Sequence, residues 1–209
     1  MTTFLVYAHP QNCSFNHALK EITLSTVSKL QVSDLYEMQF KAVADWNDFK
    51  ETKGLSTNYS QAQKQAFFGN LLTDDIRSEQ EKLLVCKRLI LQFPLWFFSA
   101  PAIIKGWMDR VFANGFAYDT GKWFETGLLQ GRKAFISVTT QSSESAYSSN
   151  GIHGNITDYL KPLHHTLRLV GFTVEDPFVA YAIDKSSEEE RRAYLDAYRK
   201  RIVSFTKSM

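Results

Sequence analysis

The stretch LQFPLWFFSAPAIIKGWMDRVF, from Leu91 to Phe112, decides how this chain is expected to fold. The apolar run from Leu89 to Phe93 predicts a buried strand, which should end at Pro94 because proline has no amide to donate within a sheet. Pro101 suits the first turn of a helix, so the rest of the stretch predicts an amphipathic helix that ends at Phe112. The stretch therefore predicts a strand, a loop and a helix.

Three adjacent aromatic residues, Trp96, Phe97 and Phe98, fall in the loop of that unit. Connections of this kind lie at the surface, where large rings are unfavourable unless something covers them. A planar ligand is one explanation. Because 14% of the chain is aromatic, packing beneath a loop or in a subunit interface is the other, and this segment alone leaves both open.

Apolar strands alternate with amphipathic helices along the whole chain. Strands are expected at Thr3 to Ala8, Val32 to Leu35, Leu89 to Phe93, Lys133 to Val138, and along an edge strand from Phe172 to Val179 that Pro177 interrupts. Helices are expected at Ser14 to Leu30, Gln61 to Leu71, Asp74 to Lys87, Pro101 to Phe112, Asn155 to Val170 and Ser187 to Phe205, the last with a capping box formed by Ser187 and Glu190. This alternation predicts one doubly wound α/β domain over residues 1–209, with a mostly parallel five-stranded sheet. A long polar excursion, Glu37 to Leu72, follows the second strand.

Composition excludes several classes of function. The formal net charge is only +2 and the basic residues are dispersed, so nucleic acid is not expected as a partner. No apolar run approaches the roughly 20 residues of a membrane span, and the N-terminus does not resemble an export signal. Cys13 and Cys86 are isolated thiols, which predicts a soluble protein of the reducing cytoplasm without structural metal.

In a doubly wound sheet, ligands bind at the carboxyl ends of the strands. Three loops are expected there, at Ala8 to Ser14, Pro94 to Ala100 and Thr139 to Gly154. The first loop ends with Ser14 at the expected N-cap of a helix, where free amides and a hydroxyl suit a phosphate. It carries neither of the glycine-rich phosphate-binding motifs, and a serine that only caps its helix is the plainer alternative.

The third loop, TTQSSESAYSSNGIHGN, is rich in hydroxyl groups that could satisfy the polar edge of a heterocycle. Tyr147 offers a phenol that donates a hydrogen bond without ionising at neutral pH, and His153 offers an imidazole that exchanges a proton there. A serine-rich loop is often only a flexible connection. Beside an aromatic platform, however, this combination suits a redox heterocycle.

Four segments together resemble the flavin-dependent NAD(P)H:quinone oxidoreductases of the flavodoxin-like fold. They are AHPQNCSFNHALKE (8–21), QFPLWFFSAPAIIKGWMDRVF (92–112), GFAYD (115–119) and TTQSSESAYSSNGIHGN (139–155), and they occur in the family's order. The resemblance extends from about residue 3 to about residue 205 and includes the long excursion. It implies a three-layer flavodoxin-like domain that binds FAD, with FMN as the alternative, and that usually forms a homodimer with two active sites at the interface.

The resemblance also implies a role for individual residues. The flavin phosphate would lie against His9, Ser14, Phe15 and Asn16, and the isoalloxazine against Pro94, Leu95, Trp96, Phe97 and Phe98. Its polar edge would lie against Thr139, Thr140, Gln141 and Ser142. Asn58 would be the point at which the excursion reaches the cofactor, and the distal part of FAD would lie against Asp109 and Arg191. The catalytic pair near the pyrimidine edge would be Tyr147 and His153. The substrate site would include Phe97, Phe98 and His153, with Ala117, Tyr118 and Asp119 supplied by the partner subunit.

The activity that the resemblance implies is ping-pong transfer of hydride from NAD(P)H through flavin to a quinone. Gln141 and Ser142 stand where members commonly have paired glycines, and Trp96 stands where they commonly have glutamine, so the quinone preference is open. The choice between NADH and NADPH is also open. The alternatives are an azo or nitro reductase and a flavin-containing regulatory subunit of a cation-efflux system, whose relatives lack the excursion. A flavodoxin-type electron shuttle is disfavoured because such shuttles are strongly acidic.

Overall fold

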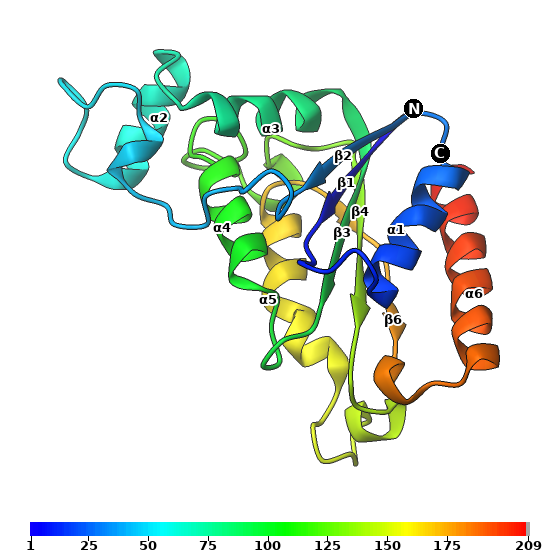
Figure 1. The fold of residues 1–209 in the computed structure, drawn as a ribbon. Helices are drawn as coiled ribbons and strands as arrows, with labels where there is room; N and C mark the ends of the chain where they lie inside the picture. The colour runs from blue at the N-terminus through cyan, green and yellow to red at the C-terminus, as the bar shows by residue number, and fades with distance from the viewer. Residues whose placement is uncertain (208–209) are drawn as a thin grey trace.

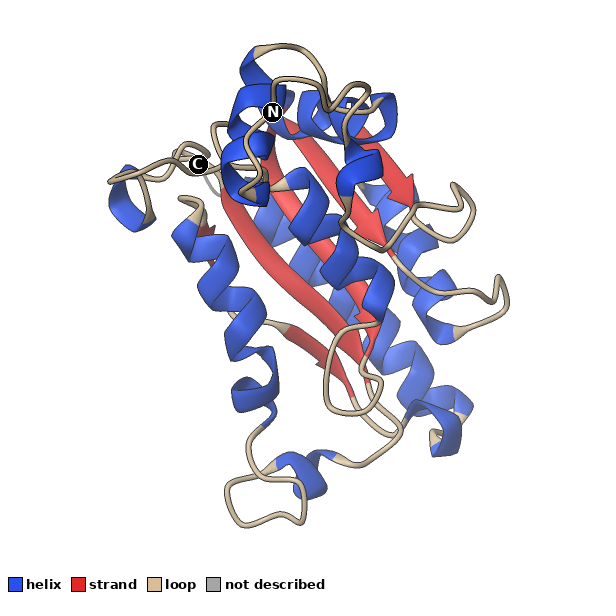
Figure 2. Ribbon diagram, turned by 90° about the vertical axis from the view of Figure 1, so that its left-hand side faces the viewer, coloured by secondary structure: helices blue, strands red, loops and turns tan. Residues whose placement is uncertain are grey.

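The computed structural model describes residues 1–207 and contains one sheet with helices on both faces (Figures 1 and 2). The strands are β1 (Thr2–Tyr7), β2 (Leu30–Asp34), β3 (Cys86–Pro94), β4 (Lys133–Thr139), β5 (Thr173–Val174) and β6 (Phe178–Ala180). They lie in the order β2-β1-β3-β4-β5, with β6 also paired to β4, and all these pairs are parallel. The predicted doubly wound, flavodoxin-like sheet is confirmed.

Six α-helices cover the sheet. They are α1 (Phe15–Thr26), α2 (Tyr59–Phe68), α3 (Asp74–Val85), α4 (Ala102–Val111), α5 (Ile156–Leu169) and α6 (Glu188–Lys207). Helices α1 and α6 lie side by side on one face, and α3, α4 and α5 cover the other, while α2 projects from the edge of the molecule (Figure 1). These positions give the three layers that the sequence predicts.

The strands alternate their side chains between two apolar cores, as the period of two in a β-strand requires. Along β1, Phe4 and Val6 belong to the larger core beneath α3, α4 and α5, whereas Leu5 and Tyr7 face the smaller core beneath α1 and α6. Because both faces of the sheet are covered, the strands are almost continuously buried.

The fifth position of the sheet is divided between two short strands. Thr173 pairs with Lys133 near the start of β4, and Val179 pairs with Val138 near its end. Pro177 lies between these two segments. The predicted interrupted edge strand is therefore confirmed.

Three predicted boundaries were wrong. Helix α1 ends at Thr26 rather than at Leu30, because Val27 is extended and Leu30 already pairs with Thr3 of β1. Helix α3 ends at Val85 rather than at Lys87, and β3 begins at Cys86 rather than at Leu89. No proline or glycine marks these junctions, so the sequence carries no signal for where one element stops.

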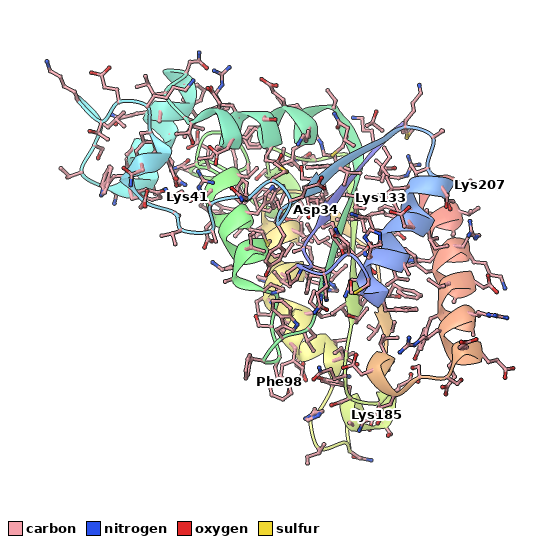
Figure 3. All side chains as sticks on the ribbon, in the orientation of Figure 1. Asp34, Lys41, Phe98, Lys133, Lys185 and Lys207 are labelled. Carbon is pink, nitrogen blue, oxygen red and sulfur yellow. The ribbon has the colours of Figure 1, made fainter. Side chains whose placement is uncertain are left out.

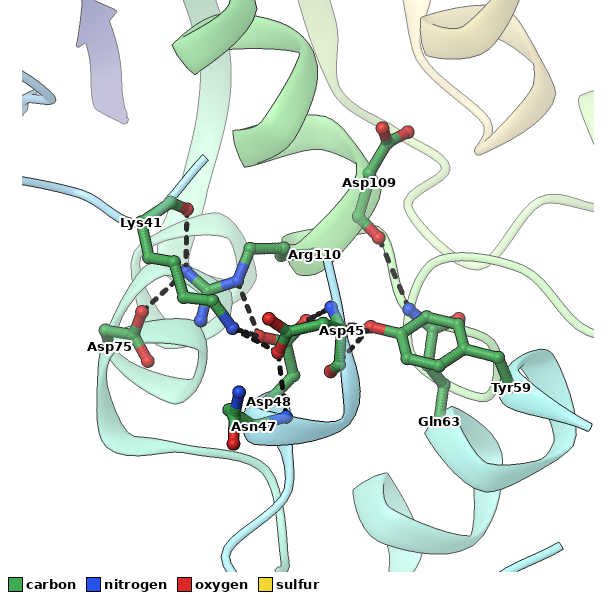
Figure 4. Close-up of polar contacts among 9 residues, drawn as sticks. All are labelled: Lys41, Asp45, Asn47, Asp48, Tyr59, Gln63, Asp75, Asp109 and Arg110. Carbon is green, nitrogen blue, oxygen red and sulfur yellow. Dashed lines mark hydrogen bonds and ion pairs between the residues drawn. The ribbon is translucent and has the colours of Figure 1, made fainter. Parts of the chain in front are cut away.

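The excursion after β2 is fixed to α4 by a buried ionic cluster (Figure 4). Arg110 Nε donates to Asp48 Oδ1 at 2.9 Å and its Nη1 donates to Asp75 Oδ2 at 2.6 Å. Tyr59 donates to the other oxygen of Asp48 at 2.7 Å. The 3₁₀ turn η1 (Trp46–Asp48) and helix α2 are thereby tied to the main domain.

A close approach of two backbones completes this attachment. A Cβ atom on Gly106 of α4 would lie 1.9 Å from the carbonyl oxygen of Ala42. Only glycine lets the excursion pass so near the helix. No helix among residues 1–207 is long and apolar enough to cross a membrane.

The carboxyl ends of the strands meet at one end of the molecule. Figure 3 shows Phe98 and Lys185 at this end, while Lys133, at the start of β4, lies at the other. The Lys185 residue belongs to a 3₁₀ turn, η4 (Ile183–Lys185), which precedes α6. The three loops that the sequence singles out thus share one end of the sheet.

Candidate functional site

A cleft of about 450 Å³ lies at the carboxyl ends of β1, β3 and β4. It is lined by His9, Pro10, Gln11, Cys13, Ser14, Phe15, Asn16, Pro94, Leu95, Trp96, Thr139, Thr140, Gln141, Ile183, Asp184 and Arg191. We call it the phosphate-loop cleft. The prediction that three separate loops converge is confirmed, because each contributes to this lining.

Asn16 is held rigidly at the wall of this cleft. Its side-chain amide donates to Thr139 Oγ1 at 2.6 Å, and its backbone carbonyl accepts from Gln92 Nε2 at 2.5 Å. Gln92 is itself fully buried and accepts from the Tyr198 hydroxyl. Among residues 1–207, no group donates to Asn16 Oδ1, although that oxygen is buried. A buried oxygen without a donor is suited to a hydrogen-bond donor on a ligand.

The loop after β1 presents further polar groups to the same cleft. Ser14 caps α1, and its Oγ accepts from the amide of His17 at 3.1 Å. The amide of Gln11 donates to His9 Nδ1 at 3.1 Å, which places the proton of a neutral His9 ring on Nε2. Burial lowers the pKa of His9 below its usual value, so the neutral ring is favoured. Amides, a hydroxyl and Arg191 together suit an anionic ligand.

The aromatic run forms a tight two-residue turn. Trp96 and Ser99 exchange backbone hydrogen bonds of 3.0 Å each, and Phe97 and Phe98 between them have φ values of 48° and 62°. A left-handed backbone is unfavourable for such bulky residues, and strain of this kind is typical of functional sites. The Phe97 side chain is fully exposed, so packing within this chain does not explain it.

A second cleft, of about 290 Å³, lies on the other side of this turn. It is lined by Leu95, Trp96, Phe97, Phe98, Gln141, Ser142, Tyr147 and His153, and we call it the aromatic cleft. Leu95, Trp96 and Gln141 line both clefts, so the two adjoin along these residues. The prediction that an aromatic wall lies beside a phenol and an imidazole is confirmed.

The rings of Tyr147 and His153 are in contact, with centroids 4.9 Å apart. Phe98 meets His153 edge to face at 5.2 Å, and Ser142 Oγ lies 3.0 Å from His153 Nε2. Burial, together with the neighbouring Tyr159, raises the pKa of Tyr147, so its phenol stays protonated at neutral pH. The aromatic cleft therefore combines a hydrogen-bond donor, a proton-exchanging ring and an apolar wall.

Five residues that the resemblance implicates lie outside both clefts. Asn58 caps α2 and accepts from the amide of Gln61, while Asp109 forms an ion pair with Lys105. Ala117 is buried, Tyr118 lines a separate groove between α4 and α5, and Asp119 is paired with Lys64 at 2.6 Å. None of the five lines either cleft of this chain, so their roles stay predictions. For Ala117, Tyr118 and Asp119, the predicted role is in the site of a partner subunit.

The structure adds lining residues that the sequence did not indicate. Ile183 and Asp184 reach the phosphate-loop cleft from η4, which is placed there by hydrogen bonds from Ile183 N to Thr140 O and from Ala182 N to Ser142 O. Neither residue belongs to a recognisable motif. They reach the cleft because β6, which precedes η4, pairs with β4. Within residues 1–207, no cluster of side chains has the composition of a metal site.

Known proteins resemble this chain over nearly its full length. A family profile described as "Flavodoxin-like fold" matches residues 1–202. Ribosyldihydronicotinamide dehydrogenase [quinone] of Mus musculus is 39% identical over 97% of this chain and 91% of its own length, and NAD(P)H dehydrogenase [quinone] 1 of Cavia porcellus is 36% identical over 95% and 74%. A crystal structure from Klebsiella pneumoniae, described as a quinone reductase, matches all of this chain and 86% of its own with a TM-score of 0.93 and 37% identity.

Proposed function

This chain belongs to the quinone dehydrogenase family of the flavodoxin-like fold, and we propose that it is a flavoprotein that transfers hydride from NAD(P)H to a quinone. The observation that carries this proposal is that the two clefts adjoin at Leu95, Trp96 and Gln141. A polar cleft suited to an anion lies next to an aromatic cleft that Tyr147 and His153 line. A flavin has the corresponding two parts, a phosphate tail and a planar ring.

Several features support the fit of a flavin to the phosphate-loop cleft. The unpartnered Asn16 Oδ1 would accept from the ligand, and the Ser14 end of α1 would hold a phosphate. We propose FAD rather than FMN because Arg191 also lines this cleft, where its charge would favour a second phosphate. Pro94 and Leu95, with the three aromatic residues that follow them, would line the ring, and residues 139–142 would line its polar edge.

The flavin, when bound, supplies a carrier that accepts and releases hydride. The chain's own contribution is to hold protons beside it. Tyr147 donates from its hydroxyl, which its raised pKa keeps protonated, and the imidazole of His153 would act beside it as a second proton carrier. Phe97 and Phe98 would form an apolar surface against which nicotinamide and quinone bind in turn.

The active protein would be a cytoplasmic homodimer. An apolar groove of about 330 Å³ between α4 and α5 includes Tyr118 and Asp109 and supports contact with a second copy. Asn58, Asp109 and the segment from Ala117 to Asp119 would then complete the partner's site. Cys13 and Cys86 are both unpaired thiols, which supports a reducing compartment.

The decisive experiment is to purify the protein, release its flavin by denaturation and identify it, and then to follow NADH and NADPH oxidation with menadione. We expect FAD and ping-pong kinetics. Tyr147→Phe and His153→Gln should slow flavin reduction by roughly ten- to a hundredfold while flavin stays bound. A colourless protein that takes up neither FAD nor FMN would refute the proposal, and unchanged reduction rates in both variants would remove the assigned roles.

A further inference from the structure

In the loop after β4, the side chain of Ser142 makes a polar contact with the ring of His153. Ser142 Oγ lies 3.0 Å from His153 Nε2, and within residues 1–207 this is the only hydrogen bond to that ring. Both residues line the aromatic cleft. Ser142 is half-buried, so the contact is partly shielded from competing water.

The position of the Ser142 hydroxyl is set by its backbone. The Ser142 carbonyl accepts two hydrogen bonds, from Thr140 Oγ1 at 2.7 Å and from the amide of Ala182 at 3.1 Å. One of these donors directly follows β4 and the other belongs to the segment after β6. Two segments that follow neighbouring strands therefore hold the backbone from which the Ser142 hydroxyl extends.

Among residues 1–207, the other contacts of His153 do not distinguish its two ring nitrogens. The His153 amide donates to Ala146 O at 2.9 Å, and its carbonyl accepts from the Tyr159 hydroxyl, but both contacts fix only the backbone. Phe98 and Tyr147 pack against the ring through apolar surfaces, which accept a ring turned by 180° equally well. Only the Ser142 hydroxyl distinguishes nitrogen from carbon at the ring edge.

We propose that Ser142 is a positioning residue that selects which nitrogen of His153 faces the reacting groups and which nitrogen carries the proton; this rests on the proposed hydride transfer. In the neutral ring the Ser142 hydroxyl would donate to Nε2, which leaves the ring proton on Nδ1, and the same hydroxyl would accept from Nε2 once the ring is fully protonated. The contact therefore persists when His153 gains or loses a proton, and Nδ1 stays in a constant orientation through the cycle. A glycine or alanine at this position could not do this.

The test compares Ser142→Ala, Ser142→Thr and Ser143→Ala in the flavin-loaded protein. Ser143 belongs to the same loop, but its hydroxyl contacts only Ser145 Oγ among the described residues, at 2.9 Å, so it is a matched control. Two quantities are measured: the rate of flavin reduction by NADH and by NADPH as a function of pH, and the tautomer of His153 from the nitrogen-15 shifts of its ring.

Loss of this hydrogen bond in Ser142→Ala should slow flavin reduction roughly five- to tenfold and displace its pH profile. His153 should change from one neutral tautomer to a mixture. Ser142→Thr, which keeps a hydroxyl, should recover most of the rate, and Ser143→Ala should match the wild type.

An unchanged tautomer in Ser142→Ala overturns the proposal. A second outcome also overturns it: the rate of flavin reduction decreases only in proportion to the flavin content, and its pH profile stays that of the wild type. Such a decrease would be a structural effect. If the wild-type protein reduces no flavin, the proposed function fails by itself, and the ring nitrogen shifts still decide whether Ser142 orients His153.

Discussion

Replacement of Arg110 by methionine should separate the excursion from the main domain. Arg110 and Asp48 are 1% and 2% exposed at their side chains, and the guanidinium also binds Asp75 and the carbonyl oxygen of Lys41 (Figure 4). Methionine fills a similar volume but supplies none of these donors. The variant therefore tests whether the buried charge, rather than packing, attaches η1 and α2.

Removal of one partner from a buried ion pair typically costs about 3–5 kcal/mol, because the remaining charge stays buried. Here Asp48 keeps three other contacts, from Lys41 Nζ at 2.9 Å, from the Tyr59 hydroxyl at 2.7 Å and from the backbone amide of Asp45 at 3.2 Å. The cost in the free energy of unfolding should therefore lie near the lower limit, at about 3 kcal/mol. For a protein of this size, that corresponds to a fall of about 6–12 °C in Tm.

Urea unfolding, followed by circular dichroism at equal flavin occupancy, measures the free energy. The matched control is Lys50→Gln, which breaks an ion pair to Asp74 that also joins the excursion to the main domain but is exposed to solvent. The control should leave stability nearly unchanged, since exposed pairs contribute little. A loss below about 1 kcal/mol in Arg110→Met, or an equal loss in the control, would refute the reasoning.

Three further outcomes follow from the same structure. Gly106→Ala places a methyl group where the Ala42 carbonyl lies, 1.9 Å from the expected Cβ, and should lower the free energy of unfolding by at least about 2 kcal/mol in urea; wild-type stability would contradict this. Burial alone would raise the pKa of Asp75, but hydrogen bonding and charge from Arg110 outweigh it, so the net pKa is lowered. Stability from this carboxylate is then present above the unfolded pKa of about 3.9 and is lost as pH falls through the lower folded value, which an acid titration should show as a steeper decline in the wild type than in Arg110→Met. Phe97→Asn, at a φ of 48°, should raise the Tm of flavin-free protein by relieving about 1 kcal/mol of strain, while flavin binding or turnover weakens; a lower Tm would argue against strain.

The architecture and much of the site could be predicted from local sequence. Pro94 and Pro101 have few compatible positions in a strand or a helix, so the strand, loop and helix around them follow from backbone chemistry. The apolar alternation then places the three loops at one end of a parallel sheet, and this is where both clefts lie. Prediction failed where no proline or glycine separates adjoining elements, as at the junction of Val85 with Cys86.

The remaining features depend on contacts between distant segments, which no local pattern records. Asp48 and Arg110 lie 62 residues apart, and nothing in the sequence around either residue indicates that they pair. The contribution of Ile183 to the phosphate-loop cleft likewise follows from the pairing of β6. From the sequence, Ser142 could be assigned to the polar edge of the ring and recognised as standing in place of a glycine. Its contact with His153 Nε2 is visible only in the structure.

The turn formed by Phe97 and Phe98 shows why a functional site resists prediction from propensity. Two-residue turns with positive φ strongly favour glycine and asparagine, so a sequence chosen for stability alone would not place two phenylalanines there. The surrounding backbone nevertheless holds them, through the paired hydrogen bonds of Trp96 and Ser99 and through the bond from Leu95 N to Thr139 O. The conformation turns Phe97 fully into solvent while Phe98 remains against His153. The strained backbone of Phe97 and the full exposure of its ring both lower stability. A ligand that covers the exposed ring is the simplest explanation for why the fold keeps them.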